Sequence, residues 1–306
     1  MLARKISDFT AYLFVRVLVC IAQAIRIETG QRVAEFLAWL LYDVLHVRRK
    51  VVMDNLEHAF PELSPKEREK IARDMWRHLF LLALEVAHTP RKIHETNWRS
   101  FVHIENKAEV VRALLEDRPT MIVTAHFGNF EVGGYVLGVL GFPTHTIART
   151  LDNPYIDKFV NEFRGKTGQF IIPKNGGFGM IEEVLSSNGT LTVLSDQHAG
   201  RKGYGATFFN RKASTHKAIA LLSLDHDTPI IMCAVRRVGR PLQFQIEIGP
   251  VADPRSLDEE LHTVSGLTQW FTNCLEESIR RSPDQYWWVH RRWKEVRPRK
   301  RHKKAA

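Results

Sequence analysis

The amino end of the chain carries the longest apolar run. Residues Phe9 to Ile27 include fifteen apolar side chains in 19 positions, which is close to the length that spans the hydrocarbon of a bilayer. On a helix of 3.6 residues per turn, one stripe collects the polar side chains Lys5, Tyr12, Arg16 and Gln23 and leaves a wide apolar face. The pattern predicts a helix that lies on a membrane surface or inserts shallowly, with a single spanning helix as the alternative.

A second apolar helix is predicted from Val33 to Val47, and the basic residues Arg48 to Lys50 follow it directly. Basic residues beside an apolar helix suit anionic headgroups on the cytoplasmic side of a membrane. Two other interpretations stay open. Ala22 to Ala24 resembles a signal-peptide cleavage site, although Arg16 argues against one, and both helices can be ordinary core helices. We expect residues 1–50 to form a membrane-associated helical region.

From Phe101 onward, short apolar runs alternate with helical patterns, which is typical of an α/β domain. We predict strands at 120–125, 145–148, 170–173 and 190–195, and a hairpin formed by 229–238 and 242–248. We predict helices at 132–140, 155–165, 180–186, 215–224 and 257–281. The fold class is therefore α/β, with a mixed sheet flanked by helices, and residues 51–296 form one domain because no linker interrupts them.

Composition limits the class of protein. An apolar fraction of 44% in 306 residues is ample for a core and excludes a disordered chain. Of the net charge of +10, residues 291–304 carry +8, so the basic character belongs to the tail at 297–306 and the residues just before it. Such a tail suits an anionic surface, either nucleic acid or lipid. Cys20, Cys233 and Cys274 are far apart and indicate neither a disulfide framework nor a zinc site.

Polar residues follow three of the predicted strands at the point where each strand ends. His126, Arg149 and Asp196 each lie at or just past such an end. Ligands of α/β sheets bind beyond the carboxyl ends of the strands, where the loops converge. We therefore expect these three side chains to share one site.

His126 and Glu131 are the clearest candidates for chemistry. On a continuous helix, five residues rotate about 140°, so the two side chains can face one substrate only if the chain turns between them. We expect His126 at a strand exit and Glu131 in the first turn of the next helix. A carboxylate that holds one imidazole nitrogen as N–H leaves the other free to accept a proton. The alternative is that both residues are structural, with Glu131 favouring a helix N-terminus.

Four motifs occur in order along the chain, and a fifth segment follows the third of them. They are Thr124 to Glu131, Arg149 to Pro154, Ser195 to Gln197 and Pro283 to Lys294, with Phe208 to Thr215 after the third. Together they resemble the late acyltransferases of lipid A biosynthesis, the lauroyl and myristoyl transferases, whose wider family includes phosphatidylinositol mannoside acyltransferases. The resemblance covers nearly the whole chain.

The resemblance implies a glycerolipid-acyltransferase-like fold and an enzyme at the cytoplasmic face of the bacterial inner membrane. It would move a fatty acyl chain from a thioester of acyl carrier protein or coenzyme A to a hydroxyl of a membrane glycolipid, a lipid A precursor. No metal, cofactor or nucleic-acid partner is expected. Acylation of another glycolipid or phospholipid stays open, as does a metal-dependent hydrolase that uses the ligands His126, Glu131, Asp196 and His198.

The resemblance also implies residue roles. His126 is the general base, Glu131 is its partner, and Arg149 and Asp196 lie in the same cleft. We expect Arg149 to grip a phosphate or the acceptor headgroup, and Asp196 to orient Arg149 or a substrate hydroxyl. Backbone N–H groups near Gly128 and Asn129 are candidate donors to the oxyanion.

The tryptophans of the last motif allow two interpretations. Trp287, Trp288 and Trp293 stand among basic residues, a combination found where proteins meet lipid headgroups. They can equally form a buried end of the domain.

Overall fold

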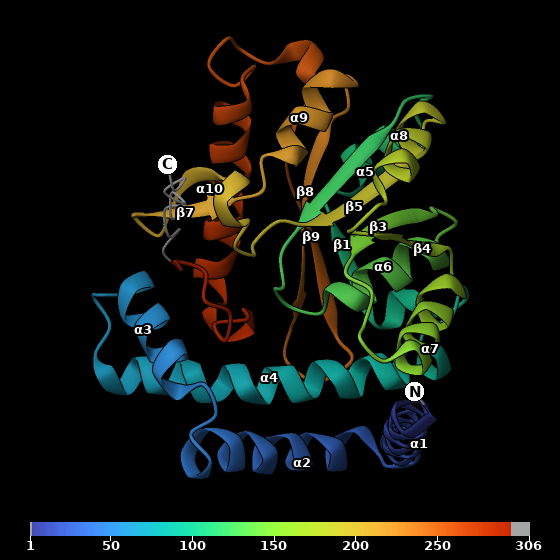
Figure 1. The fold of residues 1–306 in the computed structure, drawn as a ribbon, viewed down its shortest axis with the longest axis vertical. Coiled ribbons are helices and arrows are strands. Elements are labelled where there is room, and N and C mark those ends of the chain that lie inside the picture. Colours follow the sequence, from blue (N-terminus) through green and yellow to red (C-terminus); the bar gives the residue numbers. More distant parts are fainter. Residues whose placement is uncertain (1, 295–306) are drawn as a thin grey trace, which may run out of the picture.

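A computed structural model describes residues 2–294 and has a seven-stranded sheet at its centre (Figure 1). The strand order is β1-β9-β8-β2-β5-β3-β4, and every neighbouring pair is parallel except β8 with β9. The strands are β1 (Val102–Glu105), β2 (Thr120–Thr124), β3 (Thr144–Ala148), β4 (Gln169–Pro173), β5 (Thr190–Leu194), β8 (Ile230–Arg237) and β9 (Phe244–Ala252). The predicted mixed sheet is confirmed. The predicted basic tail, 297–306, lies outside the described residues.

Helices cover both faces of the sheet. One face packs against α8 (Phe178–Ser186), α9 (Ala218–Asp225) and α10 (Val264–Arg281), and the other lies under α5 (Lys107–Leu115) and α6 (Phe130–Val139). In the central strand β2 the side chains alternate: Met121 and Val123 enter the core on the first face, whereas Ile122 and Thr124 face a cavity beneath α6. All of β2 is buried, as expected of a parallel strand covered on both sides.

The predicted strands and helices of the domain match the structure except in three places. A hairpin of β6 (Tyr204–Phe208) and β7 (Arg211–Thr215) was not predicted, so the helix expected from Thr215 begins at Ala218. The last helix begins at Val264 rather than Leu257, because the Thr263 side chain accepts the Gly266 N–H and caps it there. Strand β1 and helix α5, which follow one another at residues 102–115, were also missed.

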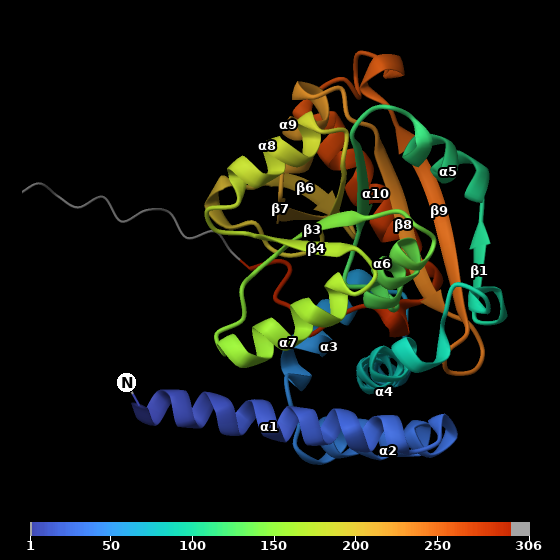
Figure 2. The same cartoon turned by 90° about the vertical axis from the view of Figure 1, so that its right-hand side faces the viewer.

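The amino-terminal helices form a separate layer at one end of the molecule, with α4 (Pro65–Lys92) between this layer and the sheet (Figure 2). The layer consists of α1 (Leu2–Ala24) and α2 (Ile27–Trp39), and α2 continues as a π-helical turn, Leu40–Val44. After it, α3 (Arg49–Ala59) packs on α4. The two apolar helices predicted from the sequence are confirmed as helices.

The polar stripe of α1 faces the protein. The Gln23 side chain donates to the Ala87 carbonyl of α4 at 2.8 Å, and the Asp8 carbonyl accepts from Asn153, which caps α7 (Pro154–Gly165), at 2.7 Å. The Arg16 guanidinium lies 4.9 Å from the ring centroid of Phe159 on α7. Helix α1 therefore lies along the body of the protein rather than projecting from it.

The opposite face of this layer is apolar and exposed. Its large exposed side chains are Leu2, Ile6, Phe9, Leu13, Phe14, Val17, Leu18 and Ile21 on α1, and Val33, Phe36 and Trp39 on α2. Among residues 2–294, α1 is the one helix that is long and apolar enough to cross a membrane by length and composition. Exposed apolar patches of this extent on a folded protein mark interaction surfaces.

Candidate active site

His126 lies directly past the exit of β2 and is held by Asp196. The Asp196 Oδ1 atom lies 2.9 Å from the His126 Nδ1 atom and accepts the His126 backbone N–H at 3.1 Å. Asp196 follows β5, which pairs in parallel with β2, so the two strand ends are neighbours. The carboxylate is only 3% exposed. A buried imidazole–carboxylate pair therefore stands at the carboxyl edge of the sheet.

Glu131 is not the partner of His126, which corrects the role predicted from the sequence. It lies in the first turn of α6, as expected, but its carboxylate pairs with both the Nε and a terminal nitrogen of Arg164 on α7. The imidazole is instead bound by a residue 70 positions away. Glu131 remains close enough for its charge to help raise the pKa of His126.

The two members of the pair stabilise each other's charged forms. Burial alone would lower the pKa of His126, but the charge and the hydrogen bond of Asp196 outweigh it, and the pKa rises above its usual value. Burial would raise the pKa of Asp196, yet the imidazole opposite lowers it. Because Asp196 is the acceptor, Nδ1 carries the hydrogen in the neutral ring and Nε2 offers a lone pair.

One amide side chain and one aromatic ring lie next to the free nitrogen, Nε2, of His126. The Gln197 amide nitrogen lies 3.4 Å from Nε2, and the Trp287 ring lies over the imidazole at a centroid distance of 4.8 Å. Neither residue was predicted as a site residue, although both belong to motifs found in the sequence. Their positions limit the directions from which a reactant can reach Nε2.

A largely apolar cavity of about 330 Å³ opens beside His126. It runs between α6 and the sheet toward α5, past Ile122, Ile231 and Ile246, and reaches Val110. Its lining is predominantly hydrocarbon, and His126 contributes to its wall. Such a cavity suits an alkyl chain whose reactive end meets the imidazole.

The structure does not support the predicted oxyanion donors at Gly128 and Asn129. The Gly128 N–H donates to the Gln285 carbonyl at 2.9 Å, and the Asn129 N–H donates to the Val235 carbonyl at 2.7 Å. Gly128 has φ of +56°, and a Cβ atom there would lie 1.7 Å from the Val235 carbonyl oxygen. Only glycine fits this position, so the role of Gly128 is to let the loop backbone lie against the backbone of β8 at Val235.

Asn129 is completely buried and acts as a helix cap. Its side-chain oxygen accepts the Val132 N–H at 3.3 Å, and its amide nitrogen donates to Glu85 at 2.9 Å. The next two residues, Phe130 and Glu131, line the cavity. Their N–H groups belong to the first turn of α6, where intrahelical bonding provides no acceptors.

Arg149 lines the cavity, but its side chain is exposed to solvent, whereas that of Asp196 is buried. Its side chain is 72% exposed and pairs with Asp152 at 2.6 Å. Asp196 binds His126, whereas Arg149 pairs with Asp152, so the predicted orientation of Arg149 by Asp196 is corrected. Lys174 and His216, which were not predicted, line the cavity too. Burial, together with the charge of Lys174, lowers the pKa of His216 to about 4.

The tryptophans of the last motif form a buried end of the domain, and the lipid-interface interpretation is wrong. Trp288 is 1% exposed and packs in the main core. Trp293 stacks on Phe208, with ring centroids 5.7 Å apart. Trp287 packs on the imidazole of His126.

The metal ligands suggested by the sequence are not gathered in the structure. Glu131 is paired with Arg164 and Asp196 with His126. Across the described residues, 2–294, no group of three or more His, Cys, Asp or Glu side chains is arranged to hold a metal ion.

Comparison with known proteins places the chain in a family. A family model described as bacterial lipid A biosynthesis acyltransferase matches residues 2–295. The lipid A biosynthesis palmitoleoyltransferase of Escherichia coli K12 is 26% identical over 81% of this chain and 79% of its own length. The lauroyltransferase of the same organism is 24% identical over the same shares. An acyltransferase of Haemophilus influenzae is 25% identical over 81% of this chain and 78% of its own.

Among solved structures, the 1-acyl-sn-glycerophosphate acyltransferase of Thermotoga maritima is similar with a TM-score of 0.40. Its identity is 13%, and the alignment covers 86% of this chain and 99% of that one.

Proposed function

Because this chain belongs to the bacterial lipid A biosynthesis acyltransferase family and is an O-acyltransferase, we propose that it moves a fatty acyl chain from a thioester to a hydroxyl of a lipid A precursor. The donor is an acyl thioester of acyl carrier protein or coenzyme A. The observation that supports this most directly is the apolar cavity beside an imidazole whose other nitrogen is bound to a buried carboxylate. No metal takes part.

The reaction begins with the acyl chain in the cavity and its thioester carbonyl near His126. The acceptor hydroxyl attacks the carbonyl carbon and gives its proton to Nε2, while Asp196 stabilises the imidazolium that forms. The negative charge that develops on the carbonyl oxygen is stabilised by the N–H groups of Phe130 and Glu131. The tetrahedral intermediate then breaks its C–S bond, and the leaving thiolate takes the proton from the imidazolium.

The cations near the cavity mouth bind the anionic parts of the substrates. Arg149 and Lys174 line the cavity beside its catalytic wall, and phosphate groups occur in lipid A precursors and in the pantetheine arm of both donors. Arg149 is exposed and pairs with the exposed Asp152, so a phosphate can replace that partner at little cost.

The exposed apolar layer attaches the enzyme to the membrane in which its acceptor resides. Helix α1 contacts α7 and α4 between Asp8 and Gln23, so it would have to leave the body to span a bilayer. We therefore propose that α1 and α2 lie in the plane of the interface, on the cytoplasmic face of the inner membrane, with their apolar side chains among the lipid tails.

The test is transfer in a purified system, with acyl carrier protein or coenzyme A thioesters as donors and a lipid A precursor in vesicles as acceptor. The products are identified by mass spectrometry. Replacing His126 by Ala abolishes transfer, whereas the matched change His103→Ala, at an exposed histidine on β1, leaves it intact. Retained transfer in the His126 variant would reject the general-base role, and acylation of a different lipid would reject the acceptor.

Exhaustive chelation tests the metal-free proposal. The rate should be unchanged, because the proton acceptor is His126. A rate that falls on chelation and returns on adding a divalent ion would favour the metal-dependent hydrolase.

A further inference from the structure

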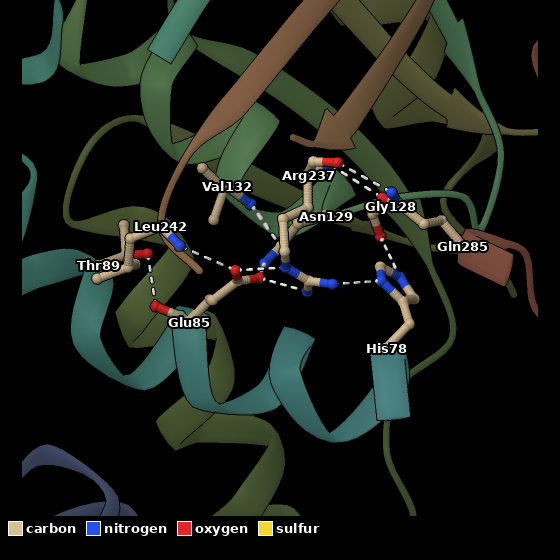
Figure 3. A network of polar contacts seen from close by, with 9 residues as sticks. All are labelled: His78, Glu85, Thr89, Gly128, Asn129, Val132, Arg237, Leu242 and Gln285. Carbon is tan, nitrogen blue, oxygen red and sulfur yellow. Dashed lines mark hydrogen bonds and ion pairs between the residues drawn. The ribbon is translucent and has the colours of Figure 1, made fainter. Parts of the chain in front are cut away.

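A buried carboxylate on α4 collects four hydrogen bonds from three parts of the chain (Figure 3). Glu85 is 0% exposed and accepts from the Nε and a terminal nitrogen of Arg237, both at 2.6 Å. It also accepts from the Asn129 side chain at 2.9 Å and from the Leu242 N–H at 3.0 Å. All four hydrogen bonds are therefore accepted by a carboxylate that is shielded from water.

This network binds the loop that follows the catalytic histidine. Asn129 and Gly128 lie three and two residues after His126. His78, also on α4, has its Nε2 atom 3.2 Å from the Gly128 carbonyl and its Nδ1 atom 2.8 Å from Arg237. Since the guanidinium is always a donor, Nδ1 accepts and Nε2–H donates to the Gly128 carbonyl.

The carboxyl-terminal segment binds the same loop from the other side. The Gln285 side chain bonds to both the N–H and the carbonyl of Arg237 at 2.9 Å, and its own carbonyl accepts the Gly128 N–H. The Trp287 N–H donates to the His126 carbonyl at 3.1 Å. The backbone from His126 to Asn129 is thus held by α4, β8 and this segment together.

The network does not touch the reacting atoms. Among the described residues, neither Glu85, Arg237 nor Asn129 lines the cavity beside His126. Buried ion pairs contribute little to stability compared with apolar residues of the same size. The Glu85–Arg237 pair instead fixes the position of the loop, which carries the imidazole at one end and the first turn of α6 at the other.

We propose that Glu85 and Arg237 are positioning residues for acyl transfer: through Asn129 and Gly128 they set the place of His126 and of the α6 amides relative to the acyl cavity. The inference rests on the proposed role of His126 as the base. A displacement of about 1 Å caused away from the chemistry can lower a rate by about a hundredfold, so the effect of losing the network belongs mainly to kcat.

The sharpest variant is Asn129→Asp. An aspartate keeps the helix cap but sets a second carboxylate against Glu85, so the loop is pushed from α4. We expect kcat per folded enzyme to fall by about tenfold to a hundredfold, with little change in KM for the thioester. The exchange Glu85→Gln with Asn129→Asp restores one acid and one amide at the same contact and should recover most of the rate. Asn129→Ser is a milder change that keeps a capping oxygen. Its kcat should lie between those of Asn129→Asp and the exchange variant.

A second readout separates positioning from simple loss of structure. An imidazole displaced from Asp196 loses the interaction that raises its pKa, so the acid limb of the rate profile should move to lower pH in Asn129→Asp and return in the exchange variant. Asp253→Asn is the matched control, because it breaks the Arg118–Asp253 pair, with bonds of 2.7 and 2.8 Å, elsewhere in the domain. It should lose thermal stability without a change in kcat or in the pH profile.

The positioning role is overturned if Asn129→Asp and Asn129→Ser turn over like the wild type per folded molecule, or if only KM changes. It is also overturned if the exchange variant recovers stability without recovering kcat. Failure of the proposed function has a different signature: His126→Ala would then remain active, whatever the Glu85 and Asn129 variants do.

Discussion

At the carboxyl end of β2, the polar groups of His126, Asp196 and the loop that follows are bound by hydrogen bonds from several segments. The amino-terminal layer is the reverse, because α1 leaves eight large apolar side chains exposed and has no buried residue. Helix α4 lies between them. Its Glu85 and His78 bond to the loop that follows His126, whereas its Ala87 carbonyl and Leu84 contact α1 and α2.

The two regions differ in how tightly their sequences constrain function. A hydrogen bond needs a particular donor and acceptor at a particular distance, so single atoms matter in the catalytic region. Apolar attraction to a lipid phase depends on the area that is buried and has no direction. The catalytic region should therefore fail when one atom changes, and the layer should respond in proportion to the apolar area removed.

The largest expected effect is that of Asp196→Asn. An asparagine can present an N–H to Nδ1 and favour the wrong tautomer, so kcat should fall by about 10⁴-fold. Glu131→Gln changes the pairing with Arg164 rather than the imidazole, and the loss should be smaller, about tenfold to a hundredfold. Steady-state kinetics of the two isosteric variants compare the carboxylates directly. A larger loss at Glu131 would contradict the partner seen in the structure.

The pH dependence should follow the raised pKa of His126. As the proposed base, His126 must be neutral to act, and its folded-state pKa lies above the ordinary value of 6.5, so kcat/KM should rise with pH until the medium passes that raised pKa. On the acid side the rate should fall about tenfold per pH unit. In Asp196→Asn, burial still lowers the pKa and the opposing charge is gone, so the midpoint should move to lower pH. An unmoved midpoint would mean that another group titrates.

In the amino-terminal layer, a graded loss is expected. Phe14→Lys together with Leu18→Lys removes two exposed apolar side chains of α1, which contribute about 1.5–3 kcal/mol each when fully buried in an apolar phase. Vesicle sedimentation should show binding weakened by about tenfold or more, with turnover of a detergent-dispersed acceptor unchanged. Leu115→Lys, at a more exposed leucine on α5, is the control and should bind vesicles normally. Equal loss in the control would remove the special role of the layer.

The smallest effect is expected for Arg149→Gln. The Arg149–Asp152 pair is exposed on both sides, and such pairs contribute less than about 1 kcal/mol to stability. The melting temperature should stay almost the same, while KM for the phosphate-bearing substrates rises several-fold if the cation binds them. An unchanged KM would mean that Arg149 does not bind the substrate and is only a surface residue.

Much of the domain follows from local patterns. The apolar runs at 120–125 and 190–195 predict buried strands because no polar residue other than threonine or serine interrupts them. The hairpin β6–β7 escaped prediction because its strands are short and its turn residues, Phe209 and Asn210, both have positive φ without a glycine to signal a turn. The polar stripe of α1 follows from the helical period, but its packing on α4 and α7 appears only in the structure.

The sequence by itself determined that a histidine leaves a buried strand, that an acid opens the next helix, and that the first helix has one wide apolar face. Each of these depends on the spacing of neighbouring residues. The tertiary structure alone decided which acid holds the histidine. Glu131 is close in sequence, but β2 lies beside β5 in the sheet, and that pairing brings Asp196 to the imidazole from 70 residues away. Strand order depends on packing summed over the whole domain, which no local pattern contains.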